Sequence, residues 1–271
     1  MNKDILELRG LGKRYVSART GETVEALAGV DLKVRQGEFL AIVGPSGCGK
    51  STMLGLIAGF AQPTDGHVLF KGLPVAGAAP ERGVIFQDYA LFPWRTVMGN
   101  VEFGPLARGV PAAQRQRRSR ELIKLVGLEG FEHRYPHELS GGMRQRCALA
   151  RMLANEPELW LMDEPLAAVD QQTRTILQDE LLRLWGDGAG VADRTKPTVI
   201  LVTHAIDEAV FLADRIVVLA RRPGRIKAIV DSPLPRPRAE VRTSPEFAAL
   251  CARVWELIRD EAVQAIAEET G

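Results

Sequence analysis

The 271-residue sequence predicts an α/β fold built on a mostly parallel β-sheet. In the second half of the chain, short apolar runs such as 159–162 alternate with helical segments. This alternation is typical of βαβ units, whose parallel strands are covered by helices on both faces. Near the N-terminus, segments 5–9 and 24–34 alternate apolar and polar residues, which is typical of antiparallel strands with one solvated face. We therefore expect a parallel core with an antiparallel β subdomain.

The individual elements follow from apolar runs, helical spacing and capping residues. Ser140, for example, is a good N-cap for the helix that follows it. Strands are expected over 5–9, 24–34, 39–43, 68–70, 159–162, 198–203 and 216–220, and helices from about 49, then over 111–126, 140–155, 171–185, 205–213 and 245–268. The charged helices of the middle section predict a helical subdomain over about 88–155.

Two irregular segments complete the organisation. The glycine-rich stretch GDGAGVADRTK at 186–196 is expected to be a mobile loop. The stretch DSPLPRPR at 231–238 is a proline-rich connector, and the C-terminal helix after it has apolar residues at helical spacing. We expect this helix to pack on its own domain. The chain is thus divided into a main domain, 1–230, and a connector with C-terminal helix, 231–271.

Composition limits the partners and the compartment. Lysine and arginine number 35 against 34 acidic residues, so no overall charge favours nucleic acid or anionic lipid, and no nucleic-acid partner is expected. The three cysteines match no metal spacing or disulfide framework, which suits a reducing cytosol; they are Cys48, Cys147 and Cys251. No stretch approaches the roughly 18 apolar residues of a membrane span, so membrane association is expected only through a partner.

The stretch GPSGCGKS at 44–51 fits the pattern G-x-x-x-x-G-K-[ST], the P-loop. Its glycines let successive amide groups face one concavity, and the following helix adds its N-terminal partial charge, so the loop suits an anion. Lys50 is expected to bridge the β- and γ-phosphates of a nucleotide, and Ser51 to ligate Mg²⁺. A glycine-rich turn with a chance lysine is the alternative, but strand, loop and helix occur in the required order. The expected nucleotide-binding residues here are Gly44, Pro45, Ser46, Gly47, Cys48, Gly49, Lys50, Ser51 and Thr52.

The apolar run 159–162 delivers two carboxylates to a strand's C-terminal end, where α/β sheets place their sites. Asp163 can hold Mg²⁺ directly or through water, and Glu164 can act as the general base that polarises an attacking water. A kinase would need no such glutamate, so the pair favours hydrolysis. An ordinary acidic strand end is the alternative, which the adjoining Pro165 and the P-loop argue against.

The stretch LSGGMRQR at 139–146 is a second glycine-bearing helix start that is suited to an anion. Since one P-loop already serves one triphosphate, we expect this helix start to serve the nucleotide of another copy. A simple capped helix start is the alternative, and it leaves the paired Gly141 and Gly142 unexplained.

In this order, the motifs resemble the ATP-binding subunit of ATP-binding cassette (ABC) transporters over about residues 5–230. The resemblance implies the ABC ATPase fold of the P-loop NTPases, with ATP and Mg²⁺ as ligands. It implies that Gln87, in VIFQD, contacts Mg²⁺ and senses the membrane subunit. It further implies that His204, in LVTH, holds the γ-phosphate and the attacking water, and that Tyr15, in GKRY, stacks on adenine. Outside this context, Tyr15 and His204 would each be ordinary core or surface residues.

The same resemblance implies a homodimer in which two copies enclose two ATP molecules. The residues that would act on the partner's nucleotide are Ser140, Gly141, Gly142, Met143 and Asp170. Met143 stands where the family more often has glutamine, and LAAVD at 166–170 departs from the usual sequence before Asp170. The catalytic residues would be Lys50, Glu164 and His204, and the Mg²⁺ ligands Ser51, Gln87 and Asp163.

The segment LFPWRTV at 91–97 resembles the corresponding segment of importers for taurine, aliphatic sulfonates and nitrate, and the tail around 223–247 is similar to that subfamily's ending. The resemblance implies a bacterial inner-membrane permease as partner on the cytoplasmic face, and a solute-binding protein indirectly. Phe92, Pro93 and Trp94 are the expected permease contact, because an exposed apolar cluster marks a binding surface. A soluble ABC ATPase acting on DNA or ribosomes is the alternative function.

Overall fold

The computed structural model describes residues 3–17, 20–167, 169–186, 196–238 and 240–269, except for the side chains of 260 and 262–269. The loop expected over 186–196 lies mostly outside the described residues. The chain forms two compact units: unit 1 combines Met1–Ala79 with Asp179–Gly271, and unit 2 is Pro80–Gln178. Each unit is described by itself.

The parallel sheet of unit 1 confirms the α/β prediction. It contains β3 (Phe39–Val43), β8 (Thr198–Val202), β9 (Arg215–Leu219) and β10 (Ile226–Asp231). Strand β3 is central and pairs in parallel with both β8 and β9, while β10 pairs antiparallel with β9. Every residue of β3 and β8 is buried. Such unbroken apolar runs are required because both faces of a parallel sheet are covered.

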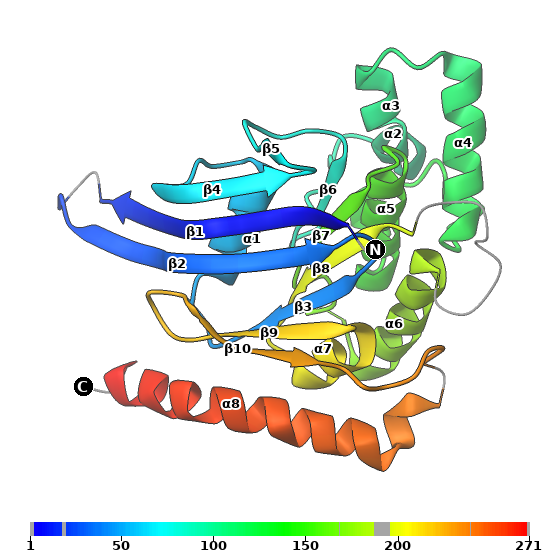
Figure 1. Cartoon of the computed structure of the whole chain (residues 1–271). Helices are drawn as coiled ribbons and strands as arrows, with labels where there is room; N and C mark the ends of the chain where they lie inside the picture. Colours follow the sequence, from blue (N-terminus) through cyan, green and yellow to red (C-terminus); the bar gives the residue numbers. More distant parts are fainter. Residues whose placement is uncertain (1–2, 18–19, 168, 187–195, 239, 270–271) are drawn as a thin grey trace. The chain divides into compact units, whose positions relative to one another are not determined.

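Unit 1 also contains the expected antiparallel sheet, in the strand order β2-β1-β4-β5 (Figure 1). Its strands are β1 (Asp4–Val16), β2 (Thr23–Arg35), β4 (Asp65–Phe70) and β5 (Leu73–Pro74). The sequence predicts the first strand only to residue 9, whereas β1 continues to Val16. Its pairing with β2 resumes after irregularities near Leu11, where the alternation that marks a strand is interrupted. This extension carries Tyr15.

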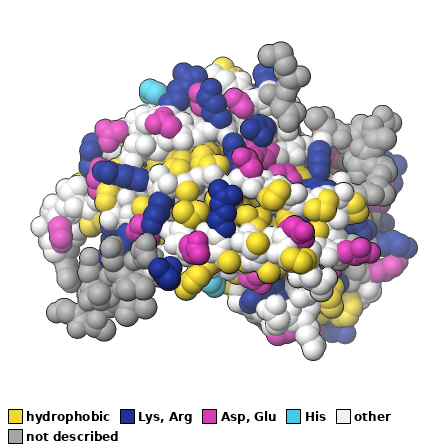
Figure 2. All heavy atoms as spheres, turned by 60° about the horizontal axis from the view of Figure 1, so that its bottom comes forward, with side chains coloured by type: hydrophobic (Ala, Val, Ile, Leu, Met, Phe, Trp, Pro, Cys, Tyr) yellow, Lys and Arg dark blue, Asp and Glu magenta, His cyan; other side chains and the backbone are white. Residues whose placement is uncertain are grey.

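Three helices belong wholly to unit 1: α1 (Lys50–Ala58), α7 (Ile206–Leu212) and α8 (Pro245–Glu269). A short 3₁₀ turn, η2 (Val241–Thr243), precedes α8, which packs on α7, β9 and β10 through its buried Leu250 and Val254. The prediction that the C-terminal helix packs on its own domain is therefore confirmed. On the face turned forward in Figure 2, hydrophobic side chains lie among charged groups of both signs.

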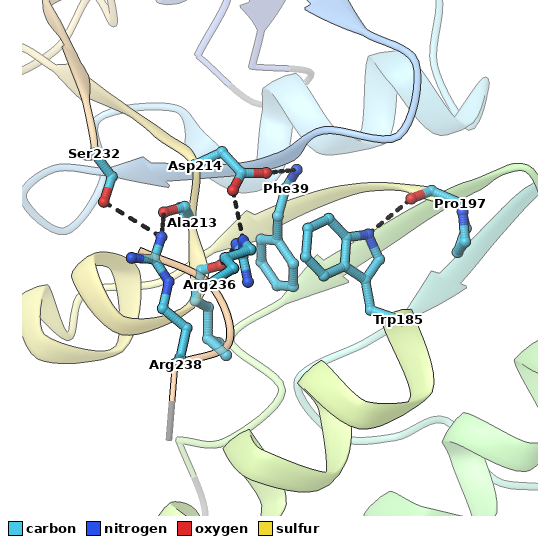
Figure 3. A network of polar contacts seen from close by, with 9 residues as sticks. Phe39, Trp185, Pro197, Ala213, Asp214, Ser232, Arg236 and Arg238 are labelled. Carbon is cyan, nitrogen blue, oxygen red and sulfur yellow. Dashed lines mark hydrogen bonds and ion pairs between the residues drawn. The ribbon is translucent and has the colours of Figure 1, made fainter. Parts of the chain in front are cut away.

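Within unit 1, two arginines of the proline-rich connector bond to the residues between α7 and β9 (Figure 3). Arg236 forms an ion pair with Asp214 (2.8 Å), and Arg238, only 1% exposed, donates to the Ala213 carbonyl (2.8 Å). Asp214 also accepts a hydrogen bond from the Phe39 amide (2.9 Å). Trp185 packs edge-on against the Phe39 ring at 5.2 Å between centroids. Asp214 thus links the connector to Phe39, the first residue of β3.

Unit 2 has two parallel strands, β6 (Arg82–Ile85) and β7 (Leu159–Asp163), and several helices. The helices are α2 (Val97–Val101), α3 (Phe103–Ala107), α4 (Ala112–Leu125), η1 (Pro136–Glu138) and α5 (Gly141–Leu153), followed by the first residues of α6 (Gln171–Trp185), which continues into unit 1. The predicted helices agree with α4, α5 and α6 to within two residues at each end. The short α2 and α3 escaped prediction because five residues are too few to show a helical period.

Candidate functional site

The loop between β3 and α1 curves around the side chain of Lys50. The Lys50 ammonium donates hydrogen bonds to the carbonyls of Gly44 (2.8 Å) and Pro45 (2.9 Å) and lies 3.8 Å from the Cys48 sulfur. Lys50 is only 6% exposed. Its positive charge therefore sits at the centre of the loop, where an entering anion would meet it.

Glycines are required in this loop for steric reasons. Gly49 has a φ of 98°, and a Cβ there would lie 2.7 Å from the Ala26 carbonyl oxygen. A Cβ on Gly44 would lie 2.8 Å from the Leu219 carbonyl oxygen. The loop is thus pressed closely against β2 and β9, and only glycine fits at these two positions.

The start of α1 has amide groups without helical partners. Gly49 is the N-cap residue and offers no side-chain cap, and the first amides of a helix have no carbonyl of the preceding turn to bond, which suits an anion. Ser51 is exposed there and Thr52 is half-buried. Together with Lys50, these groups form a cradle for phosphate oxygens.

Cys48 is buried beneath the same loop, with 1% of its surface exposed. Burial raises the pKa of the Cys48 thiol, and the neighbouring Lys50 charge offsets this only in part. The thiol is therefore neutral at physiological pH and fills space between the loop and its support.

His204 lies two residues after the end of β8, which is next to the strand that leads into the P-loop. It is exposed, whereas the preceding Thr203 is buried and bonded on both sides. The Thr203 amide donates to the Ile42 carbonyl (3.2 Å), and its hydroxyl donates to the buried Glu208 carboxylate. Because β3 and β8 are parallel neighbours, His204 and the P-loop occupy the same edge of the sheet.

Tyr15 lies at the far end of β1 and is 46% exposed. Lys13 holds its ammonium 5.1 Å from the centre of the Tyr15 ring. The ring is therefore available for stacking, and its contact with adenine stays a prediction.

In unit 2, the carboxyl ends of β6 and β7 bring three of the expected residues to one edge. Gln87 follows β6 and is exposed, Asp163 ends β7, and Glu164 follows it; both acidic side chains are half-buried. Glu164 has a φ of 45°, a left-handed conformation that is costly for a residue with a side chain. The surrounding structure therefore holds Glu164 in a backbone conformation that the residue itself disfavours, as is common at functional sites.

The LSGGMRQR stretch forms the capped start of α5. The Ser140 hydroxyl accepts a hydrogen bond from the Met143 amide (3.3 Å), as predicted for an N-cap. A Cβ on Gly142 would lie 3.1 Å from the Thr173 side chain, so the glycine permits a close approach of α6. Asp170 caps α6 through the Thr173 amide (3.0 Å) and hydroxyl (2.7 Å). These bonds hold the pKa of Asp170 below its usual range, so the side chain is ionised.

Trp94 is 71% exposed at the tip of the loop before α2, and the neighbouring Pro93 is exposed as well. Behind them, the Phe92 ring lies 5.7 Å from the Trp94 ring and 4.4 Å from the Phe103 ring. The three aromatic rings therefore form a surface cluster next to Pro93, and the permease contact expected of Phe92, Pro93 and Trp94 stays a prediction.

Asn100, a residue with no role in the sequence prediction, holds this loop in shape. It is fully buried, and its amide oxygen accepts from the Phe92 amide (2.9 Å). Its amide nitrogen donates to the carbonyls of Phe92, Arg95 and Thr96 at 3.0 to 3.2 Å. The sequence offers one indication of this role, namely an asparagine that follows shortly after an apolar loop.

These features define a P-loop ATPase, and comparison with known proteins identifies the family. The model of the ABC transporter family matches residues 27–167. The chain belongs to this family and is an ABC-type ATPase.

Its relatives include proteins of archaea and bacteria. The chain is 52% identical, over 246 residues, to an uncharacterized ABC transporter ATP-binding protein of Methanocaldococcus jannaschii, covering 91% of this chain and 89% of that protein. It is 42% identical over 262 residues to the taurine import ATP-binding protein TauB of Jannaschia sp., covering 93% of this chain and 95% of the relative. Among solved structures, it resembles the ATP-binding cassette MJ0796, a dimer bound to ADP and phosphate, with a TM-score of 0.71 and 31% identity over 83% of this chain and 98% of that one.

No helix in the described part of the chain is long and apolar enough to cross a membrane.

Proposed function

We propose that this chain is the ATP-hydrolysing subunit of an importer for a small solute, an organosulfonate such as taurine or an alkanesulfonate, or a nitrate-like anion. The ATP-hydrolysis part of this proposal depends on one observation: the P-loop surrounds the Lys50 ammonium, and His204 lies at the same edge of the sheet. Taurine import is the printed function of relatives that align over most of the chain. The nitrate alternative depends only on the resemblance of the 91–97 segment and of the tail around 223–247 to that subfamily.

The residues in the two units fit ATP and Mg²⁺. The cradle at the start of α1 offers amide groups and the Lys50 ammonium to phosphate oxygens. Ser51, Asp163 and Gln87 present the hydroxyl, carboxylate and amide oxygens that Mg²⁺ prefers in proteins. Bound Mg²⁺ would neutralise the charge that develops on the phosphates during hydrolysis.

Two side chains would act on water in the reaction. Glu164 would accept the proton of the attacking water as general base, and His204 would orient that water and the terminal phosphate. Lys50 would stabilise the negative charge on the β- and γ-phosphate oxygens. Lys50 and His204 belong to unit 1 and Glu164 to unit 2.

A second copy would complete each site. The solved relative MJ0796 is a dimer, and the start of α5 in this chain presents free amides beyond the Ser140 cap. Ser140, Gly141, Gly142 and Met143 would bind the partner's ATP, and Asp170 would lie across the same interface. ATP that binds the closed dimer better than the open one would drive the motion.

The aromatic cluster of Phe92, Trp94 and Phe103 would carry that motion to a membrane permease. Trp94 is mostly exposed yet held by a rigid loop, which is how an interface anchor is presented. The subunit would lie on the cytoplasmic face of the bacterial inner membrane, and an external solute-binding protein would act on it indirectly. The alternative, a soluble ABC ATPase acting on DNA or ribosomes, leaves this cluster without a partner.

Co-expression with the permease subunit of a taurine-type importer tests the proposal. The expected result is a stable complex whose ATPase activity rises when a solute-binding protein loaded with taurine is added. A panel with taurine, an alkanesulfonate and nitrate separates the solutes. An active ATPase that binds no permease and responds to DNA or ribosomes would overturn the transport assignment.

A further inference from the structure

The turn between β9 and β10, residues 220–225, is packed directly against the P-loop (Figure 1). A Cβ on Gly224 would collide with the Cys48 carbonyl oxygen and would lie 2.9 Å from the Leu27 side chain. The Gly224 amide donates to the Ala26 carbonyl (2.9 Å), and its carbonyl accepts from the Ala28 amide (3.1 Å). All of these residues belong to unit 1. The turn therefore keeps a fixed position relative to the phosphate-binding loop.

This turn places the guanidinium of Arg222 beside the exposed tip of the P-loop. One guanidinium nitrogen of Arg222 lies 3.9 Å from the point where a Cβ on Gly47 would stand. Gly47 is exposed, with a φ of 73°, and Arg222 is exposed as well. Lys50 is buried at the centre of the loop, so the two cations occupy its inner and outer sides.

Within the described residues, no hydrogen bond, ion pair or ring contact is found for the Arg222 side chain. Glu261 is an acidic side chain that bonds to this turn. It accepts hydrogen bonds from the Arg221 amide (3.1 Å) and from Lys227 (2.9 Å). Among the arginines of this turn, Arg222 is the one whose guanidinium is found beside Gly47 in the described structure. A guanidinium suits phosphate because its fork of donors matches two phosphate oxygens.

We propose that Arg222 is a second cationic ligand of the nucleotide, contacting phosphate oxygens of the ATP held in the P-loop of its own subunit. This rests on the proposed ATP site. The packed turn already fixes the backbone of the arginine, so a contact with the ligand costs the entropy of the side chain and not that of the backbone. A contact of Arg222 with the second copy in the dimer is the competing role, and the test separates the two.

The test compares Arg222→Ala and Arg222→Lys with Arg225→Ala in the full-length subunit, by titration calorimetry with ATP and ADP in Mg²⁺. Arg225 is the matched control, since it lies in the same turn and is exposed. We expect about fivefold weaker ATP binding for Arg222→Ala, corresponding to the loss of one exposed charge-assisted contact, and partial recovery with lysine. Arg225→Ala should bind within about twofold of the unchanged chain on the same scale.

Equal ATP affinity in Arg222→Ala and the unchanged chain would overturn the inference, as would equal weakening in both alanine variants. Thermal melting without nucleotide should be the same in all three, so a lowered melting temperature in Arg222→Ala would assign the arginine to folding. Gel filtration with ATP, in chains that also carry Glu164→Gln, measures whether the ATP-dependent dimer still forms. Normal ATP affinity combined with loss of the ATP-dependent dimer would assign Arg222 to the partner copy and refute the nucleotide contact.

The proposed ATP site can fail separately. If the unchanged chain binds no ATP, the proposed function is wrong and Arg222 has no nucleotide to contact. If the unchanged chain binds ATP and Arg222→Ala binds it equally well, only the inference about Arg222 is wrong.

Discussion

Replacing Trp94 by alanine should separate transport from ATP hydrolysis. The side chain is 71% exposed, so less than a third of its surface is buried within its own subunit. Fully burying a tryptophan removes up to about 250 Å² from water. At ~25 cal/mol per Å², the part that is already buried contributes at most about 2 kcal/mol to folding. The subunit should therefore stay folded and keep its basal ATPase activity.

The exposed part of Trp94 has the larger effect on assembly. Covering the remaining roughly 180 Å² would contribute at most about 4 kcal/mol, and an interface anchor of at least ~2 kcal/mol corresponds to about 30-fold in affinity. We expect Trp94→Ala to weaken permease binding by about this factor and to abolish solute-stimulated hydrolysis.

The assay measures three quantities on reconstituted transporter and isolated subunit: permease affinity, basal ATPase rate and stimulated ATPase rate. Trp255→Ala is the control, since Trp255 is 50% exposed on α8 and outside the aromatic cluster. The reasoning would be refuted by unchanged permease affinity in Trp94→Ala. Equal loss of basal and stimulated rates, together with a lowered melting temperature, would refute it as well by making Trp94 a core residue.

Four further predictions follow from the site. Glu164→Gln should still bind ATP but hydrolyse it about 10²-fold more slowly and remain dimeric in gel filtration with ATP; a monomer there contradicts the sandwich. Lys50→Ala should abolish nucleotide binding and also lower the melting temperature, because the ammonium bonds the loop carbonyls; normal ATPase turnover would contradict this. Burial raises the pKa of Cys48, so iodoacetamide should react slowly at pH 7 and faster as pH rises, whereas fast labelling at pH 7 would show an open thiol, and Cys48→Ser should stay active. The pKa of Asp170 is lowered in the folded chain, so its stabilisation is present above the usual value of 3.8 and is lost as pH falls below it. Asp170→Asn should therefore flatten the acid side of the melting profile, and an unchanged profile would contradict the cap.

Local sequence predicted the P-loop because each of its requirements is met by adjacent residues. A strand of buried apolar residues, glycines at positions with no room for a Cβ, and a helix start all lie within 39–58. The same holds for the capped start of α5, where Ser140 and its partner Met143 are three positions apart. Such patterns need no knowledge of the rest of the chain.

The sequence was less informative where an element depends on a distant partner. Strand β1 continues past residue 9 because β2 remains its hydrogen-bonding neighbour, although the apolar alternation is lost. The motif does not show that Cys48 is buried, with 1% of its surface exposed, or that Gly224 of the β9–β10 turn approaches its carbonyl oxygen. The motif identifies Lys50 as a phosphate ligand, but only the structure shows that its ammonium is bonded to the carbonyls of the loop itself.

The sequence by itself therefore determined the fold class, the P-loop and the order of the family motifs, because these depend on neighbouring residues and on regular spacing. Only the tertiary structure decided that Asn100 holds the Trp94 loop and that Arg222 stands beside Gly47, 175 positions earlier in the chain. The physical reason is that such contacts arise when strands and turns pack together, and no local pattern records which distant backbone will approach.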